Sequence, residues 1–324
     1  MVAAVRVHQY GGPEVLRYED VELAPPKEGE LQVRQTAIGV NYIDTYFRTG
    51  QYPAPSLPFV LGNEGVGEVT ALGTGVANFK VGDRVAYVAP LGCYAAARNV
   101  PSAVAVKLPD SISNEVAAAI MLKGMTVEYL LHRSYKVKAG DTILVHAAAG
   151  GVGLILSQWA KHLGATVIGT AGTEDKAKLA RENGCDHVIL YRSQDFAARV
   201  KDITGGQLCA VVYDGVGKDT VVKSLDCLRP LGTLVNFGSA SGPVENFNLG
   251  LLSAKGSLYV TRPTLGTFTS RREWLDEIAK NLFDVVSSGT VKIAINKRAK
   301  LSEAADVHRA LEGRETTGAI VMTP

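Results

Sequence analysis

Cysteine is scarce in this sequence. The 324 residues include four cysteines, Cys93, Cys185, Cys209 and Cys227, which lie far apart and form no C-x-x-C pair. A disulfide framework requires several cysteines at compact spacing, and a clustered structural zinc site requires closely spaced cysteine or histidine pairs. The sequence indicates neither, and we expect reduced, mostly buried thiols.

Long apolar runs and an excess of one charge sign are also missing. No apolar run approaches the roughly 20 residues of a membrane-spanning helix, and the first residues lack the apolar core and cleavage site of a signal peptide. The formal net charge is +2, which gives no electrostatic reason to bind nucleic acid or an acidic membrane. We therefore expect a cytoplasmic protein without nucleic-acid or membrane partners.

The first part of the chain has the pattern of a β domain. Hydrophobic residues make up 46% of the sequence and charged residues 20%, as in soluble globular proteins, and the length predicts about two domains. Short alternating segments punctuated by glycine and proline, such as 32–37, 67–72 and 81–88, predict antiparallel, barrel-like β structure.

From about residue 124 the pattern changes to alternating strands and helices, which predicts a doubly wound parallel sheet. The predicted strands are 142–147, 165–170, 187–190, 210–214, 232–237 and 257–261. The predicted helices between them are 151–163, 174–183, 194–203 and 218–228.

The tail predicts amphipathic helices near 272–287 and 302–312 and a final strand at 318–322. The parallel-sheet domain is therefore expected to be inserted into the β domain. The predicted boundaries are 1–123 plus 262–324 for the β domain and 124–261 for the inserted domain.

The most informative segment is 140–161, GDTILVHAAAGGVGLILSQWAK. An apolar strand pattern, a turn of small residues and a helical pattern follow one another, which is the context that a dinucleotide-binding motif requires. Ala148 takes the place of the first glycine, so the motif reads A-x-G-x-x-G. Backbone N–H groups at such a turn and helix N-terminus bind a diphosphate. The alternative is a glycine turn that serves packing alone.

The residues that follow favour NADPH over NADH. NAD-specific sites usually carry an acidic residue about 20 residues into the motif, which binds the ribose hydroxyls. Here that position is Thr170, whereas Lys176 can supply a positive charge to a 2′-phosphate, and Tyr191 can donate a hydrogen bond or stack on adenine. Glu174 and Asp175 are interpreted as acidic residues in the first turn of a helix, where they are favourable. The alternative for Lys176 is a solvated surface lysine.

At this point the sequence resembles, over its whole length, the zinc-free medium-chain dehydrogenases/reductases of the quinone oxidoreductase (zeta-crystallin-like) family. The resemblance implies an α/β fold with a Rossmann-type doubly wound parallel sheet inserted into a GroES-like, mainly β catalytic domain. It is carried by Gly140-Asp141, Leu144, Ala148-Ala149-Gly150-Gly151-x-Gly153, Gln158-x-x-Lys161, and the segments 11–16, 39–44, 122–126, 213–217 and 260–263.

Catalytic zinc is not expected. Zinc-dependent relatives hold the metal with a Gly-His-Glu motif and cysteines, whereas here Asn63 replaces the histidine and Asn41 stands where a cysteine ligand is expected. An amide is a poor zinc ligand. Glu64 is expected to keep a structural role, such as a buried hydrogen bond, and His146 is interpreted as a packed strand residue.

Without a Lewis acid, the expected reaction is reduction of an acceptor already primed for hydride, such as a quinone. The resemblance nominates Asn41, Tyr46, Tyr52 and Lys123 around the nicotinamide, with Tyr46 or Tyr52 as hydrogen-bond donor and Asn41 as orienter. The alternatives are packing roles for the tyrosines and a structural salt bridge for Lys123.

The resemblance also implies a set of cofactor contacts in several loops, with an exposed surface role as the alternative for the last of them. The implied contacts are Asn41, Tyr42, Tyr46, Thr126, Tyr129, Gly150, Gly151, Val152, Gly172, Thr173, Lys176, Tyr191, Gly215, Phe237, Gly238, Ser239, Pro263, Thr264, Leu265 and Arg314.

Two other functions stay open, namely NADPH-dependent reduction of activated C=C bonds in enals or enones, and a weakly catalytic NADPH-binding structural role. We also expect a homodimer, because the last strand of the cofactor sheet, about 257–261, would leave an open edge that a second copy can cover.

Overall fold

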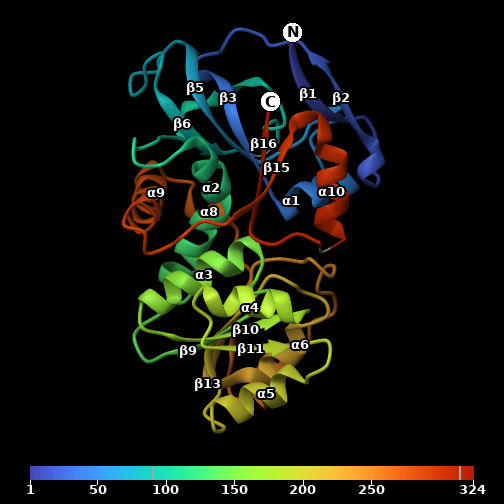
Figure 1. The fold of residues 1–324 in the computed structure, drawn as a ribbon, viewed down its shortest axis with the longest axis vertical. Coiled ribbons are helices and arrows are strands. Elements are labelled where there is room, and N and C mark those ends of the chain that lie inside the picture. Colours follow the sequence, from blue (N-terminus) through green and yellow to red (C-terminus); the bar gives the residue numbers. More distant parts are fainter. Residues whose placement is uncertain (90, 314) are drawn as a thin grey trace. The chain divides into compact units, whose positions relative to one another are not determined.

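The computed structural model describes residues 1–89, 91–313 and 315–324 and divides into two compact units (Figure 1). Unit 1 comprises Met1–Met125, Thr269–Ser287 and Ile293–Pro324, and unit 2 comprises Thr126–Phe268 and Ser288–Lys292.

The first division falls inside helix α2 (Asn114–Tyr129), close to the predicted position 123/124. The sequence pattern changes near Gly124, but the chain does not turn there, because this glycine lies in the middle of a helix. A Cβ on Gly124 would lie 2.4 Å from Cδ1 of Leu282, so the glycine allows close packing against α9 (Arg272–Ser287).

The described residues of unit 1 form a seven-stranded and a three-stranded sheet. In the larger sheet the order is β15-β16-β3-β5-β6-β8, β7 also pairs with β3, and every pairing except the parallel β15·β16 is antiparallel. The smaller sheet has the order β2-β1-β4. The strands are β1 (Val2–Val7), β2 (Leu16–Val21), β3 (Glu30–Val40), β4 (Phe59–Val60), β5 (Glu64–Leu72), β6 (Arg84–Val88), β7 (Ala97–Pro101), β8 (Ala105–Lys107), β15 (Ile295–Lys300) and β16 (Ala319–Thr323).

The helices of unit 1 are α1 (Tyr42–Thr49), the first part of α2, α9 and α10 (Ala304–Glu312). The predicted tail helices correspond to α9, with the predicted bounds, and to α10, which begins after a 3₁₀ turn at Leu301–Glu303. The predictions did not include α1, α2 or β15. Much of α2 is apolar on all sides and buried, so it has no one-sided pattern to reveal a helix.

Unit 2 contains a six-stranded parallel sheet in the order β11-β10-β9-β12-β13-β14, as predicted for a doubly wound domain. The strands are β9 (Thr142–Val145), β10 (Thr166–Ala171), β11 (His187–Leu190), β12 (Cys209–Asp214), β13 (Leu228–Asn236) and β14 (Tyr259–Thr261). The helices are α3 (Gly151–His162), α4 (Glu174–Glu182), α5 (Phe196–Ile203), α6 (Val221–Ser224), α7 (Gly250–Ala254) and α8 (Leu265–Phe268).

One predicted helix of this unit is wrong in length. The segment 218–228 forms only the short α6 and a 3₁₀ turn at Leu225–Cys227. The turn ends where β13 begins at Leu228, so the buried apolar residues that suggested a longer helix include the start of a strand.

The core of unit 2 consists of apolar side chains from neighbouring strands at one level of the sheet. Ile168, Leu144, Val212 and Leu234 are adjacent in register and each is 0% exposed. Burial of each such side chain stabilises the fold by about 1.5–3 kcal/mol. This layer fixes the strand ends from which the predicted cofactor loops emerge.

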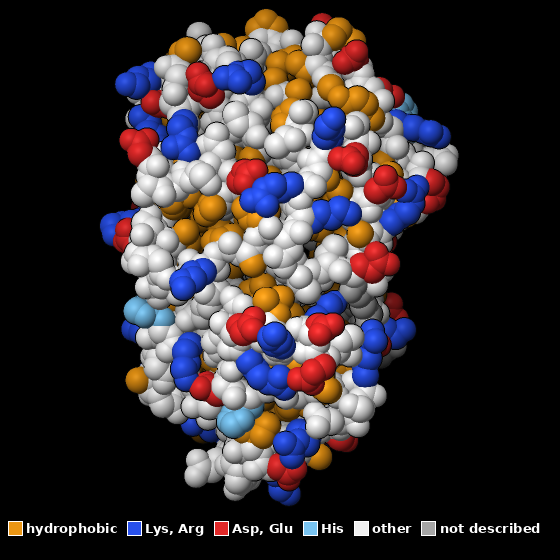
Figure 2. Space-filling model, viewed as in Figure 1, with side chains coloured by type: hydrophobic (Ala, Val, Ile, Leu, Met, Phe, Trp, Pro, Cys, Tyr) orange, Lys and Arg blue, Asp and Glu red, His pale blue; other side chains and the backbone are white. Residues whose placement is uncertain are grey.

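The outer surface shows no segregation of charge on the face in Figure 2, where Lys and Arg side chains are interspersed with Asp and Glu. Among the described residues, none of the helices combines the length and the apolar character that crossing a bilayer requires.

Candidate active site

The glycine turn of unit 2 connects β9 to α3, with Gly150 as the N-cap residue of the helix. The Gly150 N–H donates to the Ala147 carbonyl oxygen at 2.9 Å, and Ala147 adopts a φ of +53°, which is unusual for a residue with a side chain. Gly151 and Val152 are the first residues of α3. First-turn N–H groups have no partner within their own helix, so this end of α3 suits an anion.

The glycines of this turn have different roles. A Cβ on Gly153 would lie 2.5 Å from the Ala147 oxygen and 2.7 Å from Cα of Ala148, so this glycine is required for packing of the helix against its own turn. A Cβ on Gly150 would have a single protein neighbour within 4 Å among the described atoms, the Ala147 oxygen at 3.2 Å. The protein itself therefore leaves space beside Gly150, as a bound diphosphate requires.

His146, which directly precedes the turn, is fixed by hydrogen bonds of both its ring nitrogens. Its Nδ1 lies 3.1 Å from Oγ1 of Thr170 and its Nε2 lies 2.9 Å from Oγ of Ser224. The Ala147 N–H also donates to Oγ1 of Thr170, at 3.2 Å. Burial lowers the pKa of His146, so the ring is neutral. The prediction that His146 is a packed residue is confirmed.

Beyond β10, the residues predicted to hold the adenosine end form the start of α4. Thr173 caps the helix, since its Oγ1 accepts from the Lys176 N–H at 3.4 Å. Glu174 and Asp175 lie in the first turn, as predicted, and Glu174 forms an exposed ion pair with Arg181 at 2.7 Å. The Lys176 side chain is half-buried.

Tyr191 lies beside Gly172. A Cβ on Gly172 would be 2.9 Å from the Tyr191 hydroxyl and 3.3 Å from Nε of Arg192. The structure therefore places a second basic side chain at this point, which the sequence analysis missed. Its position directly after Tyr191, at the end of a predicted strand, was the available signal.

The ends of β12 and β13 are joined by a close backbone contact. A Cβ on Gly238 would lie 2.5 Å from the Gly215 oxygen. Asp214 stabilises this region because its carboxylate accepts from the N–H groups of Val216 at 2.8 Å and Gly217 at 3.0 Å. The predicted contacts Gly215, Phe237, Gly238 and Ser239 thus share the carboxyl edge of the sheet, where ligands bind in this architecture.

Thr126 and Tyr129 are both buried. The Tyr129 ring stacks on Phe268 with a centroid distance of 4.6 Å, and burial raises the pKa of Tyr129 to about 12. Among the other predicted contacts, Pro263 is buried, Thr264 is exposed and Leu265 begins α8. Arg314 lies outside the described residues.

In unit 1, the structure brings Asn41 and Lys123 together. The Lys123 ammonium donates to Oδ1 of Asn41 at 2.7 Å and to the Val40 carbonyl oxygen at 3.0 Å. The Asn41 amide in turn donates to Oε2 of Glu64 at 2.7 Å, and this oxygen lies 3.6 Å from the Lys123 ammonium. All three side chains are buried, so a positive charge is held at a fixed point by oriented acceptors.

Gly39 makes room for this cluster. It pairs in register with Glu64 across β3 and β5. A Cβ on Gly39 would lie 2.1 Å from Oε2 of Glu64 and 2.2 Å from the Ala118 oxygen. Glu64 also accepts from the Leu122 N–H at 2.9 Å, so it has the buried hydrogen-bonding role that the sequence predicted.

The tyrosines near α1 form an aromatic cluster. Tyr46 has edge-to-face contacts with Tyr42 and with Tyr52, at centroid distances of 5.6 Å and 5.1 Å, and Phe47 contacts Tyr52 at 5.8 Å. The packing alternative is therefore observed for these rings. Their role as donors to an acceptor stays a prediction.

The residues at the zinc positions of zinc-dependent relatives do not fit a metal. The Asn63 amide donates to Oδ1 of Asp44 at 2.6 Å, and the Asn41 amide is held by Glu64. The Cys93 thiol is buried beside Arg98, and burial raises its pKa to about 11. No group of three or more His, Cys, Asp or Glu side chains suited to a metal occurs within the described part of the chain.

Comparison with known proteins agrees with this arrangement. Residues 27–140 match the alcohol dehydrogenase GroES-like domain, and residues 151–281 match the zinc-binding dehydrogenase domain. Over its full length the chain is 53% identical to a quinone oxidoreductase of Pseudomonas aeruginosa, which it also covers completely. The chain belongs to the quinone oxidoreductase family of medium-chain dehydrogenases/reductases. The predicted fold class, a Rossmann-type sheet with a GroES-like domain, is confirmed.

Two further relatives are similar to this chain over almost its whole length. The solved structure of Escherichia coli quinone oxidoreductase complexed with NADPH has a TM-score of 0.97 and 48% identity, with 99% of this chain and 100% of that chain covered. A 2-haloacrylate reductase of Burkholderia sp. is 46% identical, with 100% of this chain and 99% of that protein covered. Both relatives are oxidoreductases by name, and the similarity covers at least 99% of this chain in each case.

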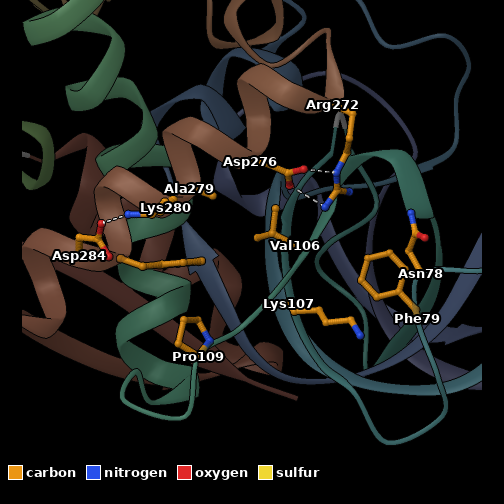
Figure 3. A pocket seen from close by; sticks show the side chains of 11 residues that line it. Asn78, Phe79, Val106, Lys107, Pro109, Arg272, Asp276, Ala279, Lys280 and Asp284 are labelled. Carbon is orange, nitrogen blue, oxygen red and sulfur yellow. Dashed lines mark hydrogen bonds and ion pairs between the residues drawn. The ribbon is translucent and has the colours of Figure 1, made fainter.

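A separate surface groove in unit 1 contains none of the predicted site residues. It is lined by apolar side chains that include Phe79, Val106 and Pro109 and by ion pairs on α9, one of which joins Arg272 to Asp276 at 2.7 Å (Figure 3).

Proposed function

We propose that this protein is an NADPH-dependent quinone reductase that transfers hydride without a metal. The observation that carries the proposal is the full-length match at 53% identity to a quinone oxidoreductase. The amides at the metal positions, each held by a carboxylate, support the metal-free part of the proposal.

The glycine turn fits a dinucleotide, because the first turn of α3 offers N–H donors and Gly150 leaves space for a diphosphate. Thr170 in place of a carboxylate, together with Lys176 and Tyr191, favours a phosphorylated ribose. The NADPH complex of the Escherichia coli relative supports the same choice. When bound, NADPH supplies the hydride.

The residues of unit 1 are proposed to bind and orient the quinone. Hydride addition leaves negative charge on a quinone oxygen, and a proton from solvent completes the hydroquinone. Asn41 orients the reactants, the Lys123 ammonium stabilises developing negative charge, and Tyr46 or Tyr52 donates a hydrogen bond to the oxygen. Fixed donors are effective here because they need no reorganisation during the reaction.

The test is steady-state oxidation of NADPH and NADH with a panel of quinones, in the presence and absence of a chelator. We expect turnover with quinones, a preference for NADPH and no loss of activity after exhaustive chelation. Loss of activity that zinc restores would contradict the metal-free proposal, and binding of NADPH without turnover of any acceptor would favour the structural alternative.

A second candidate is reduction of an activated C=C bond, which the 46% identical 2-haloacrylate reductase favours. The same hydride transfer serves both reactions, since a conjugated carbonyl or carboxylate stabilises the resulting charge. Enals, enones and 2-haloacrylates therefore belong in the same panel, and higher kcat/KM for these than for quinones would select this candidate.

We also propose a homodimer and a cytoplasmic location. Strand β14 ends the described sheet order of unit 2, and Tyr259 and Val260 on it are 60% and 38% exposed. An exposed strand edge of this kind can pair with a second copy.

A further inference from the structure

A completely buried carboxylate, Asp44, lies behind the Asn41 side chain. Its Oδ2 accepts from the Asn41 backbone N–H at 2.8 Å and from the Tyr94 hydroxyl at 2.9 Å, and its Oδ1 accepts from the Asn63 amide at 2.6 Å. Asp44 is the third residue of α1, and Asn41 is the N-cap residue of that helix. The carboxylate thus fixes the backbone from which the Asn41 side chain projects.

The hydrogen bonds behind Asp44 all point toward it. Arg48 can only donate, so Nδ1 of His308, 2.9 Å from Nη1 of Arg48, must accept. A neutral His308 then carries its proton on Nε2 and donates to the Tyr94 hydroxyl at 3.1 Å, and Tyr94 donates to Asp44. Arg48 itself is anchored by Glu312 at 2.7 Å.

This chain of donors suits an ionised Asp44 and a neutral His308. Burial and the neighbouring Arg48 guanidinium lower the pKa of His308 to about 3, so the ring stays neutral at ordinary pH. Each donor polarises the next, which strengthens the final bond to the carboxylate. A protonated Asp44 would find an acceptor only if the Tyr94 hydroxyl or the Asn63 amide turned, because all three groups that it contacts donate to its carboxylate.

We propose that Asp44 is a positioning residue for hydride transfer. Its carboxylate, held by Tyr94 and through it by His308 and Arg48, binds the Asn41 backbone N–H. It thereby fixes the Asn41 side chain, whose Oδ1 accepts a hydrogen bond from the Lys123 ammonium. The proposal rests on the proposed function, in which Asn41 and Lys123 act on the reactants. Asp44 itself need not touch substrate or cofactor, since it acts through the Asn41 backbone and through Asn63.

The arrangement also predicts a pH dependence. Burial raises the pKa of Asp44 to about 6, although the hydrogen bonds from Asn63, Asn41 and Tyr94 and the charge of Lys123 act in the opposite direction. The other ionisable groups of the cluster are Glu64, Cys93, Arg48 and His308. Protonation below pH 6 removes the acceptor that fixes Asn41, so activity should fall on the acid side.

The experiment compares Asp44→Asn with wild type in NADPH–quinone turnover. In the variant an amide NH₂ must face either the Asn63 amide or the Tyr94 and Asn41 donors, so at least one hydrogen bond is lost. We expect kcat to fall by about 10- to 100-fold, the range of a small misplacement of reacting groups. The KM for NADPH should change little, and the acid limb near pH 6 should disappear.

Asp141→Asn is the matched control. Asp141 is also buried, and its Oδ2 likewise accepts from a backbone N–H, that of Lys138 at 3.1 Å, and from a tyrosine hydroxyl, that of Tyr135 at 3.3 Å. We expect a comparable decrease in Tm with kcat and the pH profile unchanged.

The exchange variant Asp44→Asn with Asn63→Asp tests the geometry directly. The amide at position 44 can then donate to the carboxylate at position 63 and still accept from Asn41 and Tyr94, and the Leu91 N–H, 3.4 Å from Oδ1 of Asn63, keeps an acceptor. We expect the exchange to restore most of kcat.

The outcomes separate the two proposals. If wild type does not reduce quinones or activated alkenes with NADPH, the proposed function fails. If wild type is active but Asp44→Asn keeps the wild-type kcat and acid limb, or loses only Tm as Asp141→Asn does, the positioning role is overturned. Failure of the exchange variant to recover kcat in a folded protein would also overturn it.

Discussion

At the scale of single residues, the glycine turn shows that neighbouring glycines serve different purposes. Gly153 is required by the fold, because a Cβ there would lie 2.5 Å from the Ala147 oxygen, whereas Gly150 borders space that the protein leaves open. The sequence motif alone does not distinguish the two, since both fit the same pattern. Their substitution therefore separates folding from cofactor binding.

Gly150→Val should weaken NADPH binding by about 100-fold, which corresponds to ~2.7 kcal/mol, because its side chain fills the space intended for the diphosphate. Tm should fall less than in Gly153→Ala, since Gly150 has a negative φ of −78° and a Cβ there would have one protein neighbour within 4 Å, the Ala147 oxygen at 3.2 Å. Gly153→Ala serves as the contrasting variant and should lower Tm. Titration of NADPH by fluorescence measures the effect, and unchanged affinity in Gly150→Val would place the diphosphate elsewhere.

Lys176→Ala should raise the KM for NADPH by about 10-fold and leave the KM for NADH nearly unchanged, because only NADPH carries the 2′-phosphate. Lys178→Ala, an exposed lysine on the same helix, is the control and should affect neither. Equal effects of Lys176→Ala on both nucleotides would mean that this lysine does not contact the phosphate. Arg192→Ala belongs in the same series, because the structure places Arg192 beside Gly172.

At the scale of elements, α2 shows why a helix can escape notice in a sequence. The strands of unit 1 could be predicted from their alternation of apolar and polar residues, and those of unit 2 from their short, continuous apolar runs. Helix α2 shows no apolar stripe along one face, because nearly all of its sides carry buried apolar residues such as Ala117, Ile120 and Met121. Yet α2 carries both Lys123 and the Leu122 N–H that donates to Glu64, so this helix positions the buried cluster of Asn41, Glu64 and Lys123.

Gly124→Ala tests the packing of α2. Alanine is favoured over glycine in an isolated helix, but here a Cβ would lie 2.4 Å from Leu282. Overpacking of this kind costs about 1–3 kcal/mol, so the free energy of unfolding should decrease. Gly266→Ala in α8 is the control, because its Cβ would meet no described atom within 4 Å. A stabilised Gly124→Ala variant, measured by denaturant unfolding, would refute close packing at this position.

At the scale of the whole molecule, the open edge at β14 is the feature that a second copy can use. We expect sedimentation of the wild type at micromolar concentration to give a dimer. Val260→Lys should shift the protein to monomer, because a charge on an edge strand opposes edge-to-edge pairing. Turnover per chain serves as the check that the variant is folded. A monomeric wild type under these conditions would reject the dimer.

The sequence by itself determined the features that depend on local order along the chain. These are the parallel-sheet domain with its glycine turn, the acid-free end of β10 and the absence of zinc ligands at Asn41 and Asn63. Each can be read because strand–turn–helix patterns and ligand types are properties of short segments.

Only the tertiary structure decided which distant residues share a site. Asn41, Glu64 and Lys123 come from three elements, and His308 joins Asp44 through Tyr94 from the far end of the chain. No spacing rule connects such positions, because long-range contacts form when buried polar groups find partners in the packed core. The roles of Gly124 and Gly153 were decided in the same way, by how closely backbone and side chains approach.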